Sequence, residues 1–227
     1  HGSDAVRYWA ASSRLGTDAA FDPQNPKQTK IGRRLAIKVL NAAKFVYSFD
    51  APGIDAGWAA VDEGGIDAAL TAELDRVIAI ATQALDEFDH ARALEAAEQF
   101  FWTFCDDYLE LVKERAYGAS TAEGQVSAVA TLRATVEVLL LLFAPFIPFA
   151  TEEVWSWTHE GSIHVASWPT PEEAGTGAPT GLLPAVSEAL ISIRRAKTDA
   201  KASQKTDVTS ATISGPVSEP PWPRARA

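Results

Sequence analysis

The feature that most constrains this chain is the helical spacing of its apolar residues, which recurs in four long stretches separated by turn-forming residues. Between Leu94 and Leu111, for example, apolar side chains follow one another in alternating steps of three and four. A helix places residues at that spacing on one side. The stretches cover residues 30–49, 71–88, 90–117 and 121–144. Four such helices with modest connections predict an all-α fold, namely an antiparallel helix bundle.

Residues that begin and end helices support these bounds. Asp89 can cap the helix that follows it. Pro145 ends the fourth long helix, and Pro148 suits the first turn of another, short helix. At the start of the chain, Ser3 can cap a short helix whose first turn holds Asp4, where the helix dipole favours an anion.

After residue 157 the pattern becomes mixed. SIHVASWP at 162–169 alternates like a strand or an extended segment, and a loop rich in proline and glycine follows. Residues 182–203 return to the helical period, and TDVTSATIS at 206–214 has the β-branched composition of a strand. We therefore expect a small, mixed extended and helical appendage at the C-terminal end. Residues 50–66 are expected to form a loop or a small excursion from the bundle.

The charges are unevenly distributed along the chain. The net charge of −10 argues against a protein coated with nucleic acid such as DNA. Residues 23–49, however, hold six basic residues and no acidic one. The local field of such a patch matters more than the sum of all charges. The basic residues are Lys27, Lys30, Arg33, Arg34, Lys38 and Lys44.

An aromatic residue, Phe45, falls among these cations rather than among the apolar positions. At 100° per residue, it shares an arc of roughly 80° with Lys30, Arg34, Lys38 and Asn41. Single-stranded RNA binds to such surfaces, because unstacked bases lie on aromatic rings while cations hold the phosphates. Two other interpretations stay open. The ring packs against another part of the fold above solvated charges, or it belongs to a groove that binds a protein helix.

The remaining chemistry-bearing residues give no catalytic or metal site. Cys105 is the only cysteine, which excludes an internal disulfide and a cysteine-cluster metal site, and we interpret it as a core residue of a cytoplasmic protein. Glu152 and Glu153 are interpreted as partners of a helix dipole. No apolar run reaches the roughly 18 residues that span a membrane. The histidines without metal-ligand spacing are His90, His159 and His164.

Several stretches resemble a known family. GSDAVRYW, SSRLGTDAAF and KIGRRLAIKVLNAAKFV resemble the region just after the catalytic loop of class I aminoacyl-tRNA synthetases. FFWTFCDDYLELVKER and APFIPFATEEVW resemble two hallmark helices of their anticodon-binding bundle. SIHVASWP and IRRAKTDAK narrow the resemblance to the valyl-tRNA synthetase family. The isoleucyl and leucyl families share the bundle and remain the nearest rivals.

The resemblance implies a fragment of a larger enzyme. The catalytic domain with its His-Ile-Gly-His and Lys-Met-Ser-Lys-Ser signatures, the editing domain and a C-terminal coiled-coil arm would lie outside it. We expect residues 1–28 to end a stem-contact region, 29–160 to form the anticodon-binding bundle, and 161–227 to form a junction leading to the arm. The intact enzyme would join valine to tRNA(Val) with ATP and Mg²⁺. The fragment, a monomer, would carry neither cofactor nor catalytic residue.

The resemblance also implies roles for the helix that contains Phe45. That helix would face the anticodon loop, with Phe45 stacked on an anticodon base and with Asn41 or Lys44 at a base edge or sugar. The resemblance also implies that this domain reads an anticodon that ends in A and C. Phosphates would be held by Arg33, Arg34 and Lys38, and the track would be extended by Lys30 and Lys27. Arg14 is a possible contact to the tRNA stem.

Overall fold

The computed structural model describes residues 2–19, 21–22, 24, 26–50, 65–171 and 181–212, and in this part of the chain the structure is helical without strands. This confirms the predicted all-α class. Most of the expected excursion at 50–66 lies outside the described residues. The longer helices are α2 (Lys27–Tyr47), α3 (Ile66–Asp86), α4 (His90–Thr103) and α6 (Ala122–Phe143). The others are the short helices α1 (Ser3–Ala11), α5 (Leu109–Ala116) and α7 (Pro148–Trp155), and the 18-residue helix α8 (Leu182–Asp199).

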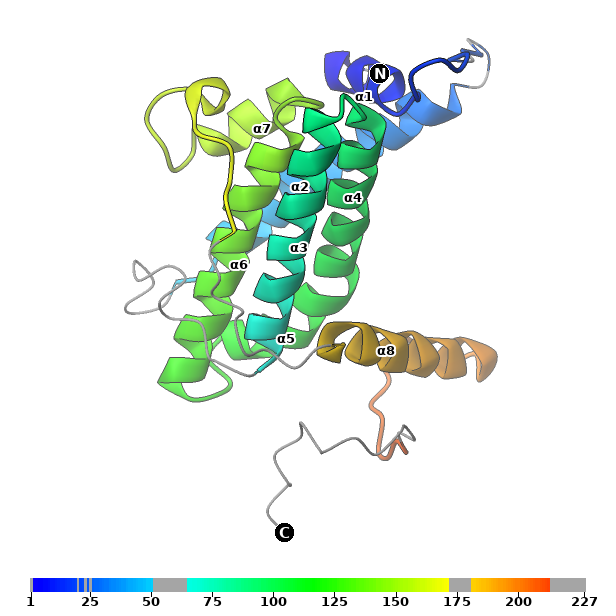
Figure 1. Cartoon of the computed structure of the whole chain (residues 1–227). Helices are drawn as coiled ribbons and strands as arrows, with labels where there is room; N and C mark the ends of the chain where they lie inside the picture. Colours follow the sequence, from blue (N-terminus) through cyan, green and yellow to red (C-terminus); the bar gives the residue numbers. More distant parts are fainter. Residues whose placement is uncertain are drawn as a thin grey trace.

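The bundle is built around α6, which lies beside α3 in Figure 1 and contacts α2, α4, α5 and α7 as well. Among the described helices, α6 is long and apolar enough to cross a membrane by length and composition, but 67% of that apolar window is buried in the bundle. Its Leu132, Leu140 and Phe143 are fully buried. They pack with Leu35 of α2 and Leu74 of α3 in one hydrophobic core.

The predicted helix between 90 and 117 contains an irregularity that the sequence did not indicate. A π-helical turn at Phe104–Tyr108 separates α4 from α5. Such a turn adds a residue to the helix and changes which side chains face inward. Here Phe104 and Tyr108 are buried, while Asp106, which lies between them in the chain, is exposed. The turn therefore places an acidic side chain on the surface beside α2.

Three of the predicted helix boundaries are confirmed. The Asp89 carboxylate accepts a hydrogen bond from the Arg92 amide at 3.1 Å, and Pro148 opens α7. The helix after Asp89 ends, with α5, at Ala116. The start of α3 was placed too late, at residue 71 instead of Ile66. The reason is that Asp67 is buried in the first turn, where the period of apolar residues predicts no charged side chain.

Buried Asp67 is satisfied by donors from three elements. Its carboxylate accepts hydrogen bonds from the Tyr108 hydroxyl at 2.8 Å and the Ser127 hydroxyl at 2.5 Å, and it forms an ion pair with Arg115. Burial, followed by the nearby Asp67 charge, raises the pKa of Tyr108 well above its usual value, so the phenol remains a donor. This network joins the start of α3 to the π turn, α5 and α6.

The first helix is fixed to the bundle at both of its ends. Ser3 does not cap α1, because Gly2 holds the capping position. Asp4 instead caps α7: its carboxylate accepts from the amides of Phe149 at 3.2 Å and Ala150 at 2.8 Å. Along its length, α1 packs on α2. The division at residue 28 stays a prediction.

The close approach of α1 and α2 depends on Gly32. A Cβ atom at this position would lie 2.5 Å from Cβ of Tyr8. The Tyr8 hydroxyl in turn donates to the Glu98 carboxylate of α4 at 2.7 Å. Both helices therefore fit together only while residue 32 has no side chain.

The C-terminal appendage differs in detail from the prediction. Ile163–Val165 form a 3-10 turn rather than a strand, because the Glu152 carboxylate accepts from the Ser162 hydroxyl at 2.9 Å and the Ile163 amide at 3.0 Å. Glu152 therefore anchors the turn, and the prediction that Glu152 and Glu153 are partners of a helix dipole is wrong, because neither lies in the first turn of α7. Glu153 accepts from the Trp157 indole at 3.2 Å. Residues 206–212 form no strand, and 213–214 lie outside the described residues.

Helix α8 confirms the predicted return to the helical period. It projects sideways from the end of the bundle that holds α5 (Figure 1). Only its first residues, Leu182 and Leu183, are buried.

Candidate nucleic-acid interface

Helix α2 has the two sides that the sequence predicts. Leu35, Val39 and Val46 are fully buried against the bundle. Among the predicted site residues of α2, Lys38 and Phe45 are half-buried. Those that are exposed are Lys27, Lys30, Arg33, Arg34, Asn41 and Lys44. The helix therefore presents its cations to solvent along one edge, which we call the α2 basic edge and define by these residues together with Lys38 and Phe45.

Two isoleucines lie on or near this edge. Ile31, which the helical period assigns to the apolar side, is exposed. Ile37 falls between the cations and keeps 45% of its surface exposed. An apolar side chain that is about half exposed among cations is a candidate contact for a ligand.

The middle of the basic edge is organised by Trp102 of α4. The Arg34 guanidinium lies 5.0 Å and the Lys38 ammonium 5.9 Å from the centroid of its ring. The Lys38 ammonium also lies 3.5 Å from the carboxylate of Asp106 on the π turn. Cation–π contacts of this kind hold long side chains in a defined direction. Both partners lie in FFWTFCDDY, the stretch around the core residue Cys105.

Phe45 is not the lone ring on a charged surface that we expected. It packs edge to face on Phe49, with ring centroids 4.9 Å apart, and lies 6.4 Å from Tyr117. Phe49 is buried, whereas Tyr117 keeps 66% of its surface exposed. The open alternative, in which the ring packs on another part of the fold, is thus partly correct. Three aromatic rings share this end of the bundle, and Tyr117 is the most accessible of them.

The other side of the basic edge faces α7. The Lys44 ammonium lies 6.0 Å from the centroid of the Trp157 ring. Further along, Arg33 and Ile37 line an open groove of about 610 Å³ between α1, α2 and α7. Phe149 of α7 lines the same groove and keeps 64% of its surface exposed. Sequence reasoning missed both aromatic residues, since each lies far from α2 in the chain.

Arg14 lies apart from the basic edge. Its guanidinium is 3.6 Å from the Glu95 carboxylate of α4, with both side chains exposed. An exposed pair of this kind is worth little, about 0–1 kcal/mol. The side chain therefore remains available to a stronger anion.

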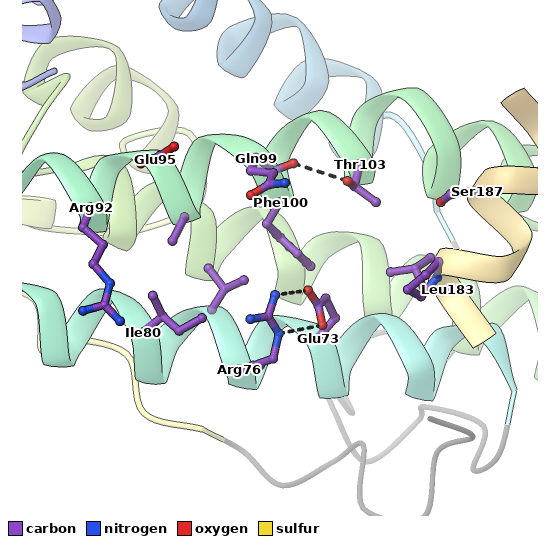
Figure 2. Close-up of a pocket in the computed structure, with 13 residues that line it drawn as sticks. Glu73, Arg76, Ile80, Arg92, Glu95, Gln99, Phe100, Thr103, Leu183 and Ser187 are labelled. Carbon is purple, nitrogen blue, oxygen red and sulfur yellow. Dashed lines mark hydrogen bonds and ion pairs between the residues drawn. The ribbon is translucent and has the colours of Figure 1, made fainter. Parts of the chain in front are cut away.

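A second groove lies on the opposite side of α4, between α3, α4 and α8 (Figure 2). Its volume is about 370 Å³. The Arg76 guanidinium donates to Glu73, as the dashed lines in Figure 2 mark, and Arg92 lies 3.4 Å from Glu87. Because these charges neutralise one another, the groove offers no concentrated field to a charged ligand.

The structure confirms that Cys105 is a core residue. It is buried, and burial raises the pKa of its thiol to about 12. A neutral thiol inside the bundle is a poor nucleophile. Among the described residues, no group of three histidine, cysteine, aspartate or glutamate side chains could hold a metal ion.

A helical bundle with one basic, partly aromatic edge is typical of a domain that binds structured RNA. The family comparison agrees with that class. The family described as the anticodon-binding domain of tRNA ligase matches residues 67–213, and the chain belongs to this family. The matched range excludes α2 but includes α3 to α8.

Comparison with individual proteins shows that the chain is similar to valine–tRNA ligases. The chain is 60% identical to the valine–tRNA ligase of Leifsonia xyli subsp. xyli over 222 residues, which cover 96% of the chain and 25% of the relative. It is 53% identical to that of Thermobifida fusca, again over 96% of the chain and 25% of the relative. The chain thus spans about a quarter of the length of these curated relatives.

A solved structure shares the fold. The ternary complex LeuRS–tRNA–LeuAMS from Agrobacterium radiobacter matches with a TM-score of 0.52 and 19% identity, over 77% of this chain and 20% of that one. At that identity the likeness concerns the fold of the bundle and not its specificity.

Proposed function

We propose that this chain binds the anticodon arm of tRNA(Val) as part of a valine–tRNA ligase. The observation that carries the proposal is the α2 basic edge, where exposed cations lie beside accessible aromatic rings. Phosphates are held by cations, and unstacked bases are held by rings. The identity to valine–tRNA ligases over 96% of the chain supports valine as the amino acid.

The expected roles of the single residues fit this proposal with one change. Arg33, Arg34 and Lys38 contact phosphates, and Asn41 or Lys44 contacts a base edge or a sugar. Phe45 still serves as a stacking surface, but Tyr117 is added to it because it is the more exposed ring. Lys27, Lys30 and Arg14 extend the contact toward the stem.

In the whole protein, ATP and Mg²⁺ serve a catalytic domain outside this region. The region itself grips tRNA and contributes no catalytic group. The proposed division is a stem-contact end at 1–28, a bundle at 29–160 and a junction at 161–227. We place the enzyme in the cytoplasm, as a monomer.

Binding assays with purified tRNAs test the proposal. The protein is titrated against fluorescent tRNAs for valine, isoleucine and leucine, and the valine tRNA is expected to bind most tightly. Removing one stacked ring costs about 1–3 kcal/mol, which is a loss of affinity of roughly 5- to 150-fold. The variants Phe45→Ala and Tyr117→Ala measure this loss. Equal affinity for all three tRNAs would refute the assignment to valine.

A second function has an observation in its favour. The groove at Ile37 and Phe149, which Asp4, Arg33 and Glu153 also line, is suited to a protein segment, as expected of a helical interaction scaffold. A Phe149→Ala variant distinguishes the two functions. If tRNA binding is unchanged and a protein contact is lost, the groove serves a protein partner.

A further inference from the structure

A second basic surface lies outside the α2 basic edge, at the end of α8. The α8 basic cluster consists of Arg195, Lys197, Lys201 and Lys205. Within this stretch the only acidic residue is Asp199, whose carboxylate lies 4.0 Å from the Arg195 guanidinium. In a chain with a net charge of −10, such a local excess of cations needs an explanation.

A neighbouring arginine anchors α8 beside α2. Arg194 forms an ion pair with the Asp107 carboxylate at 2.9 Å and also donates to the carbonyl oxygen of Asp106. The Asp106 side chain is in turn the partner of Lys38 on the α2 basic edge. The π turn thus joins both basic surfaces through two consecutive residues. The Arg194 guanidinium is occupied by these contacts to the π turn, whereas the residues of the α8 basic cluster do not take part in them.

The chain after α8 turns back along the helix, and this turn brings the residues of the α8 basic cluster closer together. Lys201 adopts a left-handed conformation with φ of 52°, and the Ala202 amide donates to the Lys197 carbonyl at 2.9 Å. The Gln204 side chain donates to the Arg194 carbonyl at 3.3 Å, and the Lys197 ammonium donates to the Gln204 carbonyl at 3.0 Å. The turn therefore brings Lys205 back along α8 toward the anchor.

Cations elsewhere on the bundle behave differently. Arg76, Arg92 and Lys113 each have a carboxylate within 2.5 to 3.4 Å. Within the part of the chain that the structure describes, Lys201 and Lys205 have no acidic group at ion-pair distance. A group of uncompensated cations that the backbone holds close together creates a local positive field, which attracts a polyanion.

We propose that the α8 basic cluster binds backbone phosphates of the same RNA that lies on the α2 basic edge, so that the RNA spans the π turn. This inference rests on the proposed function, which names that RNA as a tRNA. It adds a second contact surface, formed by the C-terminal junction and held in place by Arg194.

The test is the salt dependence of tRNA binding by the full protein chain. Each phosphate contact adds about 0.7–0.9 to the slope of log affinity against log salt concentration. The α8 variant combines Arg195→Gln, Lys201→Gln and Lys205→Gln. It retains Lys197, whose hydrogen bond to the Gln204 carbonyl holds the turn after α8 in place. Between 50 and 200 mM salt, loss of three contacts should make the fall in affinity about 20- to 40-fold smaller than in the wild type.

Two further variants remove the same number of charges. The first, in the α2 basic edge, combines Arg33→Gln, Arg34→Gln and Lys38→Gln. The second is a control on α3 to α5 that combines Arg76→Gln, Arg92→Gln and Lys113→Gln. Circular dichroism confirms that each variant is folded.

The outcomes separate this inference from the proposed function. A reduced salt slope in the α8 variant but not in the control supports the inference. A wild-type slope in the α8 variant overturns it, and so does an equal reduction in the control, which would reflect net charge alone. If the α2 variant binds as well as the control, the proposed function fails and the inference fails with it.

Discussion

Replacing Gly32 with alanine should loosen α1 from α2, although the same change normally strengthens a helix. In a helix interior, alanine is favoured over glycine by about 1 kcal/mol. Here the new Cβ would lie 2.5 Å from Cβ and 2.7 Å from Cγ of Tyr8. A rotation of the tyrosine side chain cannot move its own Cβ, so the backbone of α1 must shift.

The cost of that shift can be worked from its contacts. Overpacking costs about 1–3 kcal/mol. Movement of α1 also weakens the Tyr8–Glu98 hydrogen bond and the two bonds from Asp4 to the start of α7, together about 1–2 kcal/mol. After the gain in helix propensity is subtracted, we expect a net loss of about 1–3 kcal/mol. Undocking of α1 relieves the clash and limits the loss to this range.

Urea unfolding measures the change, and hydrogen exchange locates it. The midpoint should fall by about 0.3–1.5 M, given a slope near 2–3 kcal/mol/M. Amides of α1 should exchange faster than those of α6. The control is Gly124→Ala in α6, where the nearest atoms to the added Cβ are side-chain hydroxyls at 3.2 Å that can rotate away. A Gly32→Ala protein as stable as the wild type, with α1 still protected, would refute this account of the crossing.

Three further outcomes follow from buried and anchoring groups. Asp67→Ala leaves Arg115 and two buried hydroxyls without their acceptor, so urea unfolding should show a loss of about 3 kcal/mol, and an asparagine in its place should cost less. The Cys105 thiol should resist a thiol reagent at pH 8 until the protein unfolds. Its pKa is about 12 in the fold against 9.0 normally, so the free energy of unfolding should fall as pH rises from about 9 to 12, where only the unfolded thiol ionises. Arg194→Gln should speed hydrogen exchange in α8, because the helix loses its ion pair with Asp107, and it should also lower the stability of the bundle, because the buried Asp107 carboxylate is left without that partner; protected α8 amides would contradict the anchor.

The sequence predicted the class of the fold because the apolar period is a local signal. Helices α2 and α4 bury one side each, and α6 is apolar over most of its length, so these patterns can be recognised without knowing what the helices pack against. Asp67 shows where this fails. A charged residue enters the core when distant residues supply its donors, and no local pattern announces them. The sequence did not predict the π turn for a similar reason, since its extra residue is stabilised by packing across the bundle.

The site was predicted in part. The cations of α2 are exposed as expected, because the charge and period of one helix decide which side meets water. The neighbourhood of each cation was not predictable, because Trp102, Asp106 and Trp157 reach α2 from other elements. Phe45 makes the same point in part: the ring of Phe49 falls within the predicted stretch 30–49, but Tyr117 reaches Phe45 from the end of α5.

The pairing of charges explains why the net charge is a poor guide to what this chain binds. On α3 to α5, acids neutralise the neighbouring cations, as Glu73 does for Arg76 and Glu110 for Lys113. On α2 and α8, the acids are fewer, and Asp106 and Asp107 of the π turn pair with Lys38 of α2 and Arg194 of α8. A polyanion that approaches the bundle is therefore repelled over most of the surface and attracted at one place, which orients the encounter. The orientation and the site thus have one physical cause, the segregation of cations onto two helices that the π turn joins.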